Sequence, residues 1–294
     1  MKKKLFKLPD INRGLLKKHD HFMLFETSLF DGSNSKSYIL TDQIDTIKVN
    51  RYRDVEGAFK KIEEYSKRYY LAGYFSYELG YYFERAFFNS NDSYGYPLIN
   101  LCVFKEAKTF DHATGKLSSM VPVLFTENQG NSGFLVDRIK FSLGKREYLR
   151  KIARIKEHII NGDTYQANFT GKYLFDFSGD AFSLYRDLKE RQNVPYGAFC
   201  RFGDEYIISL SPELFFRRDG DAISSKPMKG TIERGKNIGE DREKSSDLKK
   251  SAKEAAGNLM IVDLIRNDLG KISKTGSVKV SSLFEIERTI PYFR

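Results

Sequence analysis

The sequence predicts an α+β fold built mostly from antiparallel strands. Short apolar and aromatic runs, bounded by glycine and polar clusters, fill much of the 294-residue chain, and such runs are typical of strands. Segments with helical spacing of apolar residues separate groups of these runs instead of alternating with single strands. Because several strands follow one another through short turns, this order favours an α+β architecture over a regular βαβ alternation.

The first part of the chain shows mainly the pattern of strands. An amphipathic helix is expected over 54–69, where Val55, Phe59 and Ile62 share one face. The polar stretch 126–134, which contains two glycines, is the best candidate for a domain boundary or a long loop. Strand-like runs occupy 22–30, 37–42, 69–84, 98–110 and 119–125.

The second part of the chain has a clearer helical periodicity. Residues 145–163 place Tyr148 and Ile152 on one face and stop near Gly162, which predicts a helix. Turn residues separate the later apolar runs, so these predict strands joined by tight turns. The further expected elements are a strand over 164–177, a helix over 180–192 and a run of strands over 196–230.

A last long helix is expected within 239–271. Its first half is charged, whereas the stretch from Leu259 to Ile265 is apolar nearly all round, so this half is expected to enter the core. Asp263 and Arg266 would then lie where unpaired charge is costly. They are interpreted either as a salt bridge at the helix end or as part of the wall of a site.

Composition and charge exclude several classes of protein. The 40% hydrophobic content supports a buried core, in one large domain or two ordinary ones. No run approaches the roughly 18 apolar residues of a membrane span, so a cytoplasmic protein with no membrane partner is expected. Cys102, Cys200 and four scattered histidines form neither a disulfide framework nor a thiolate and imidazole metal site, so any metal would need carboxylates.

The net charge of +10 invites a nucleic-acid interpretation. The lysines are mixed with acids along the chain, however, and no nucleic-acid-binding motif accompanies them. No nucleic-acid partner is therefore expected. An anionic small substrate would also suit a basic protein.

Five motifs occur in a fixed order in the second half: GDTYQANFT (162–170), SLSPELFF (209–216), KPMKGTIERG (226–235), NLMIVDLIRNDLGKIS (258–273) and SVKVSSLFEIE (277–287). Their order and spacing resemble the chorismate-utilising enzymes, which include anthranilate synthase component I, aminodeoxychorismate synthase component I, isochorismate synthase and salicylate synthase. The resemblance spans most of residues 142–288. Through LFETS at 24–28 and AGYFSYELGYYFE at 72–84 it extends, more weakly, across the whole chain.

The resemblance implies antiparallel sheets packed as a sandwich with helices outside. It also implies an N-terminal region over 1–135 and a chorismate-binding catalytic region over 136–294. It is closest to aminodeoxychorismate synthase component I, because KPMKGT carries a lysine where anthranilate synthases carry a small residue. The implied reaction is amination of chorismate to 4-amino-4-deoxychorismate, for para-aminobenzoate and folate synthesis, with ammonia from a glutamine amidotransferase partner. The alternatives are anthranilate synthase component I and a non-catalytic relative that binds a ligand or partner.

This interpretation depends on Lys229. Without its motif, a lysine between a proline turn and a glycine is a solvated loop charge. The resemblance makes it the nucleophile that adds at C2 of chorismate as the C4 hydroxyl departs, before ammonia displaces it. Desolvation and the like charges of Lys226 and Arg234 are expected to favour its neutral amine. The resemblance also makes Glu213 the general acid and base, against the alternative of a surface glutamate, and places Thr231 on the substrate.

Two departures from the family pattern concern magnesium. The resemblance implies Mg²⁺ held by carboxylates, one of them at the position of Gly257, and glycine offers no ligand atom. Glu254, roughly 60° away around a helix of 3.6 residues per turn, is an imperfect substitute. The second implied glutamate lies beyond Arg294, so the chain is expected to be truncated at its C-terminus. No magnesium ligand is expected to be retained, and useful turnover of chorismate is not expected of the chain as written.

Overall fold

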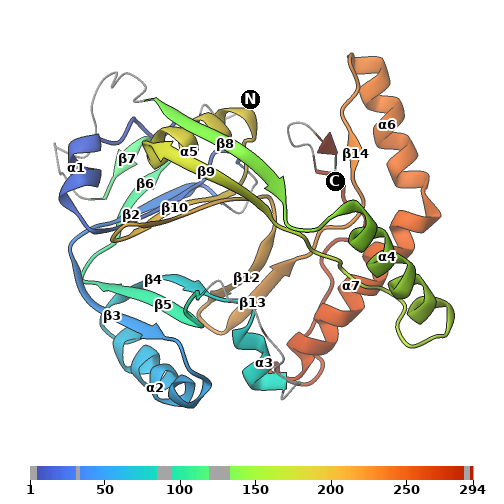
Figure 1. Cartoon of the computed structure of the whole chain (residues 1–294), viewed down its shortest axis with the longest axis horizontal. Helices are drawn as coiled ribbons and strands as arrows, with labels where there is room; N and C mark the ends of the chain where they lie inside the picture. Colours follow the sequence, from blue (N-terminus) through green and yellow to red (C-terminus); the bar gives the residue numbers. More distant parts are fainter. Residues whose placement is uncertain (1–4, 31–33, 85–94, 119–132, 288–291, 294) are drawn as a thin grey trace. The chain divides into compact units, whose positions relative to one another are not determined.

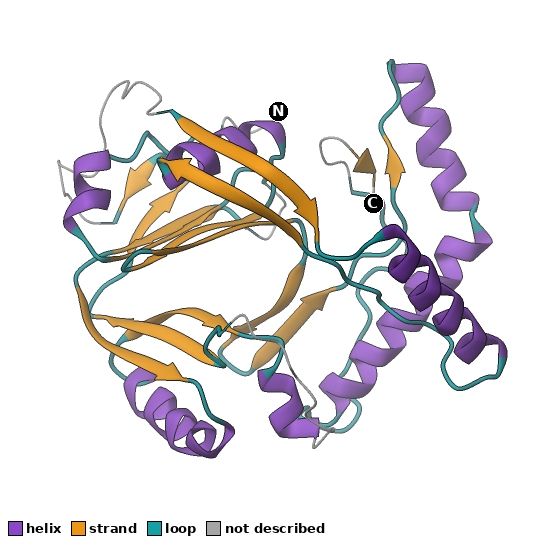
Figure 2. Cartoon of the chain, in the orientation of Figure 1, coloured by secondary structure: helices purple, strands orange, loops and turns teal. Residues whose placement is uncertain are grey.

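The chain folds into two compact units in the computed structural model, which describes residues 5–30, 34–84, 95–118, 133–287 and 292–293 (Figure 1). One unit comprises Met1–Gln129 with Asp187–Arg294, and the other comprises Gly130–Arg186. Figure 2 shows that both units combine helices with strands. The strand pairs of the described residues are antiparallel. The expected α+β fold with mostly antiparallel sheets is therefore confirmed.

The largest sheet of the first unit has the strand order β11 (Glu205–Ser211), β10 (Tyr196–Phe202), β1 (His21–Glu26), β2 (Lys36–Leu40), β6 (Lys108–Asp111) and β7 (Lys116–Leu117) (Figure 1). The pairing of β1 with β10 runs from His21 opposite Phe202 to Glu26 opposite Gly197. Its backbone hydrogen bonds therefore join the N-terminal part of the sequence to the second half.

A second sheet of the same unit has the order β3 (Gln43–Val49), β5 (Ile99–Phe104) and β4 (Tyr70–Phe75). Every residue of β5 is buried, as expected of a central strand covered on both faces. One face packs against helices, and the elements that accompany this sheet are η1 (Tyr52–Asp54), α2 (Val55–Ser66) and α3 (Leu79–Glu84).

Two apolar clusters hold these sheets in place. The first lies between the two sheets and contains Met23 of β1, Phe104 of β5 and Phe202 of β10. The second lies between the three-stranded sheet and the helices, and it contains Val55 of α2 and Leu79 of α3. Burial of such side chains is the main favourable term in folding, at about 25 cal/mol per Å² of apolar surface.

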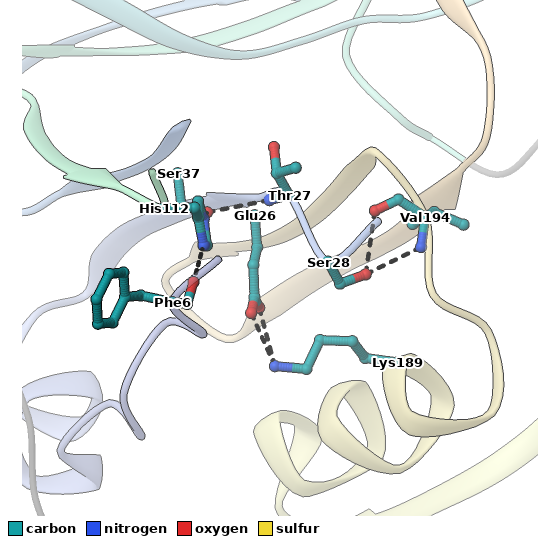
Figure 3. A network of polar contacts seen from close by, with 8 residues as sticks. All are labelled: Phe6, Glu26, Thr27, Ser28, Ser37, His112, Lys189 and Val194. Carbon is teal, nitrogen blue, oxygen red and sulfur yellow. Dashed lines mark hydrogen bonds and ion pairs between the residues drawn. The ribbon is translucent and has the colours of Figure 1, made fainter. Parts of the chain in front are cut away.

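A buried polar network fixes the end of β1 and the residues that follow it (Figure 3). The His112 Nδ1 faces the Phe6 carbonyl oxygen at 2.7 Å. Because a carbonyl only accepts, Nδ1 carries the proton, and Nε2 accepts from the Ser37 hydroxyl at 2.7 Å. The same hydroxyl oxygen accepts from the Thr27 amide at 3.0 Å. The LFETS segment is thereby tied to the sheet through groups that are almost wholly buried.

The neighbouring residues of LFETS are tied to a later part of the chain. Glu26 pairs with Lys189 at 2.9 Å (Figure 3). The Ser28 hydroxyl donates to the Val194 carbonyl at 3.0 Å and accepts from the Val194 amide at 2.9 Å. Removing one partner of such a buried pair leaves an unpaired polar group, so this segment is held firmly in one position.

The remaining elements of the first unit are α1 (Arg13–Lys18), the hairpin of β12 (Leu214–Asp219) and β13 (Ala222–Lys226), the pair of β14 (Ile232–Glu233) and β15 (Tyr292–Phe293), and the helices α6 (Ile238–Lys250) and α7 (Ala252–Gly270). The second unit contains the pair of β8 (Phe134–Phe141) and β9 (Tyr173–Gly179) with α4 (Lys145–Ile160), and α5 (Ala181–Arg191) crosses its boundary. None of the helices in the described ranges has the length and apolar character to cross a bilayer.

Most predicted elements are confirmed, but two expected strands and the last helix differ from their predictions. The expected strand over 69–84 is a strand only to Phe75, and Leu79–Glu84 is helical because Leu79 and Tyr82, three residues apart, pack on the same apolar cluster. The expected strand over 164–177 begins only at Tyr173. The expected strand 119–125 lies outside the described residues, as does most of the boundary stretch 126–134. The division into 1–135 and 136–294 stays a prediction.

The last helix also differs from its prediction. Two helices replace one, because the Ser251 backbone is extended and its side chain caps α7 by accepting from the Glu254 amide at 3.3 Å. The apolar half of α7 does not enter the core, since no residue of α7 is buried and Leu259 and Leu264 are 46% and 45% exposed. Hydrophobic content alone predicted burial, but the described residues cover this half of α7 only in part, and Met260 and Val262 are half-buried.

The two cysteines give a test of the core between the sheets. Burial raises the pKa of the Cys102 thiol to about 11 and of the Cys200 thiol to about 12, with the nearby Cys102 adding to the second shift. We expect neither thiol to react with iodoacetamide at neutral pH until the chain unfolds. Because the folded state disfavours the thiolates, the two protonated thiols contribute to the free energy of unfolding. This contribution is full below the ordinary thiol pKa of 9.0 and is lost as the pH rises through 11 to 12. Rapid alkylation of the native chain at neutral pH would contradict this core.

Candidate functional site

The KPMKGT segment leaves β13 and turns sharply at Gly230. Its φ of 79° lies in the left-handed region that favours glycine. A Cβ at this position would lie 3.2 Å from both Cβ and Oε2 of Glu254 and 3.4 Å from Cδ1 of Leu248. The turn therefore packs its backbone directly against the end of α6 and the first turn of α7. This contact places Lys229 beside the junction of the two helices.

A second contact anchors the other end of the segment to α6. The Arg234 guanidinium pairs with the Asp241 carboxylate, with Nε 3.0 Å from Oδ1 and 3.1 Å from Oδ2. The Gly235 amide donates to the same carboxylate at 2.7 Å. Asp241 raises the pKa of Arg234, chiefly through this hydrogen bonding. A bidentate pair of this kind fixes direction as well as distance, so the segment is held at both ends.

The Glu213 side chain binds the backbone of Met228, the residue that precedes Lys229. Its carboxylate accepts from the Met228 amide at 3.1 Å. Ser211 shapes the preceding turn, because its hydroxyl accepts from the Glu213 amide at 3.2 Å and donates to the Glu213 carbonyl at 3.0 Å. Glu213 itself is exposed. Its carboxylate thus lies beside the backbone that leads into Lys229, but Glu213 is not among the described residues that line the cavity below.

Lys229 lines a cavity of about 380 Å³ in the first unit. This volume is within the range of small-molecule sites. Several side chains around it can donate hydrogen bonds, as an anionic ligand requires. The polar members of the lining are Arg217, Ser224, Ser225, Lys226, Lys229, Asn258, Ser281, Ser282, Glu285 and Glu287.

A second, much smaller cavity of about 40 Å³ also has Lys229 in its wall. Glu254 and Asn258 of α7 line it, together with Phe284 and Glu285 from the segment after α7. Phe284 has a φ of 60°, which a bulky residue rarely adopts and which costs on the order of 1–3 kcal/mol. Such strain is typical of functional sites, and here it lies in the wall of both cavities.

Other predicted residues lie differently from the expectation. Lys226 pairs with Glu287 and Arg234 with Asp241, so each of the two cations that were expected to act on Lys229 has a carboxylate partner of its own. Their expected effect on the Lys229 amine stays a prediction. Thr231 is exposed beside Gly230 and is not among the described lining residues.

The salt bridge at the end of α7 is confirmed, at 2.9 Å between Arg266 Nη1 and Asp263 Oδ1, and both side chains are exposed. Sequence reasoning assigned no role to Asn258 or Glu285, although both stand in the recognised motifs. Both residues line the cavities because the segment after α7 returns to the turn at Gly230. Sequence periodicity does not reveal this return.

The described carboxylates do not fit a resident Mg²⁺ ion. Among the described residues no three histidine, cysteine, aspartate or glutamate side chains gather closely enough to hold a metal ion. Gly257 faces open space and offers no ligand atom. Glu254 is directed at the Gly230 turn. No step of the chemistry proposed below therefore passes through a metal, and the expected loss of the magnesium ligands stays a prediction.

Residues 25–290 match the family described as chorismate binding enzyme. The chain belongs to this family. Aminodeoxychorismate synthase component 1 of Escherichia coli (strain K12) is 38% identical over 146 residues, which cover 50% of the chain and 32% of that protein. Anthranilate synthase component 1 of Pseudomonas putida is 30% identical over 278 residues, covering 80% of the chain and 56% of that protein. The chain thus spans about a third to about half of these curated relatives.

A solved structure shows the same fold. Anthranilate synthase component I from Streptococcus pneumoniae TIGR4 superposes with a TM-score of 0.68 at 21% identity, and the match covers 91% of the chain and 70% of that structure. The recognition of a chorismate-utilising family from the five motifs is confirmed. The particular reaction is a separate question, because relatives with two different activities match.

Replacing Gly257 tests whether the side of α7 on which it lies is free of packed neighbours. A Cβ there meets nothing within 4 Å, so Gly257→Ala is expected to stabilise the chain by up to about 1 kcal/mol through helix propensity. The matched control is Gly235→Ala, whose Cβ would lie 2.3 Å from the Asp241 backbone nitrogen and is expected to destabilise. The urea midpoints of both variants provide the measurement. A destabilised Gly257→Ala chain would mean that this side of α7 is covered.

Proposed function

We propose that the chain binds chorismate in the larger cavity and captures it covalently on Lys229, as the first step of amination to 4-amino-4-deoxychorismate. The observation that carries this proposal is the position of Lys229 in the wall of a ligand-sized cavity rich in hydrogen-bond donors. Chorismate is a dianion with a hydroxyl group, so it needs such donors. Arg217 supplies positive charge in the same lining, where Lys226 is paired with Glu287.

The first step forms a bond between the Lys229 nitrogen and C2 of chorismate. The ring double bonds shift, and the C4 hydroxyl leaves as water after taking up one proton. We assign this proton to the Glu213 carboxyl, which the Met228 amide holds beside the lysine. The Lys229 nitrogen loses one proton as it bonds to C2, and the Glu213 carboxylate, which has just given its own proton to the leaving hydroxyl, accepts it. The net change is the loss of one water from chorismate.

The second step releases the ligand. Ammonia forms a bond to C4, the C2 bond to Lys229 breaks, and one proton passes from the incoming nitrogen to the lysine nitrogen. The sum of both steps is chorismate plus ammonia giving 4-amino-4-deoxychorismate plus water. We expect a glutamine amidotransferase to deliver the ammonia, since two of the relatives are named as component 1 of their synthases. The cytoplasm is the expected compartment, in keeping with two free buried thiols.

Anthranilate synthesis is the second candidate, favoured by the longer match to anthranilate synthase component 1. It requires no covalent lysine, so the placement of Lys229 in the cavity wall favours the first reaction. A non-catalytic role is the third candidate. It is favoured by Gly257, which leaves no carboxylate where the family pattern has one. The two steps proposed above are therefore those of a single turnover, and useful repeated turnover is still not expected of the chain as written.

Substitution of the lysine tests the proposed capture. Chorismate incubated with the chain, without ammonia, is expected to add the mass of chorismate less one water to the intact protein. Lys229→Ala should abolish this adduct while leaving the circular dichroism unchanged, because the side chain is a half-buried wall residue rather than part of the core. Lys236→Ala, at an exposed lysine seven residues along, is the matched control and should retain it. An adduct that persists undiminished in Lys229→Ala would contradict the proposal.

A further inference from the structure

The two cavities around Lys229 share a wall. Lys229, Asn258, Phe284 and Glu285 line both of them. Glu254 and Ala255 of α7 line only the smaller one, as does Ile286. The nucleophile therefore separates a large space from a small one. An adduct carried on Lys229 in the large cavity therefore has its lysine in the wall of the small cavity as well.

The two volumes suit two different reactants. About 380 Å³ accommodates a small organic ligand. About 40 Å³ holds a few molecules of the size of water, since each needs roughly 10–15 Å³ by this measure. Ammonia has nearly the size of water. The small cavity thus accommodates the second reactant of the proposed reaction and excludes a second organic molecule.

The polar groups of the small cavity suit ammonia or ammonium. Ammonium has only donors, and the Glu254 and Glu285 carboxylates and the Asn258 amide oxygen are acceptors. Lys249 also lines this cavity, and the two carboxylates offset its charge and that of Lys229. Glu254 is well placed because its side chain packs against the Gly230 turn. The described residues show no hydrogen bond or ion pair to its carboxylate. Leu248, Ala255 and Ile286 supply apolar surface that favours the neutral amine after a proton is lost.

We propose that the small cavity is the binding site for ammonia or ammonium in the second step. This inference rests on the proposed function, because it needs an adduct on Lys229. Ammonium enters, and Glu254 or Glu285 takes its proton. The resulting ammonia forms the bond to C4 as the C2 bond to Lys229 breaks. One proton passes to the lysine nitrogen, and the carboxyl returns its proton to solvent.

The test compares release of the adduct in two neighbouring variants. Ala255→Leu fills the small cavity, whereas Ala256→Leu places the same side chain on the exposed side of the same helix turn. The adduct is first formed without ammonia, and ammonium chloride is then added while intact mass is followed. The readout is the ratio of the release rate to the formation rate. We expect this ratio to fall at least about tenfold in Ala255→Leu and to stay near the wild-type value in Ala256→Leu.

A second variant covers the case in which Ala255→Leu fails to fold. Ile286→Ala widens the same cavity, so methylamine should gain on ammonia as the releasing amine by about tenfold relative to the wild-type chain. Equal ratios in Ala255→Leu and Ala256→Leu, or an unchanged preference in Ile286→Ala, would overturn the ammonia site and leave capture by Lys229 standing. Absence of any adduct in the wild-type chain would instead overturn the proposed function, and this inference with it.

Discussion

The contact between the Gly230 backbone and the Glu254 side chain is the constraint on which the candidate site depends. A Cβ at 230 would lie 3.2 Å from Cβ and Oε2 of Glu254, so the first turn of α7 would have to shift to accept it. A straight helix in place of α6 and α7 would have no first turn at Glu254 to meet the glycine. The contact orients the turn that carries Lys229. Asp241 then fixes the far end of the same segment through Arg234. Both cavities are defined by this arrangement.

The break between α6 and α7 gives Ser251 and Glu254 distinct roles. Ser251 and Glu254 have the spacing of a capping box, in which the glutamate side chain would return to the Ser251 amide. Here the Ser251 amide donates to the Leu248 carbonyl instead, at 3.3 Å. The Glu254 carboxylate is therefore available to the turn and to the small cavity. Only one of the two hydrogen bonds of a capping box is therefore formed here. Such departures from local rules are common at functional sites.

The sequence predicted much of the fold because its helices are periodic and its hairpins carry clear turn residues. The helix over Val55–Ser66 and the hairpins from Tyr196 to Lys226 followed from local pattern alone. The helix over Leu79–Glu84 did not, because aromatic residues fit a strand equally well and tertiary packing on Leu98 and Ile99 decides the outcome.

The candidate site was predicted only in part. Lys229 and Glu213 stand in motifs and were named from sequence, and Glu254 was named as an imperfect substitute for a carboxylate at Gly257. The contribution of Glu285, and the pairing of Lys226 with Glu287, required the path of the chain after α7. Contacts between residues distant in sequence leave no periodic signal. The exposure of Leu259 was missed for a related reason, since apolar content does not say what covers a helix.

The most direct test of the central contact is covalent capture of chorismate by Gly230→Ala compared with Gly203→Ala. Both glycines have a positive φ, 79° and 65°, so both variants carry a similar backbone strain. A Cβ at Gly203 meets nothing within 4 Å, whereas one at Gly230 meets Glu254. The account predicts that intact-mass measurement shows the adduct in Gly203→Ala and little or none in Gly230→Ala. Equal capture by the two variants would contradict the claim that this contact positions Lys229.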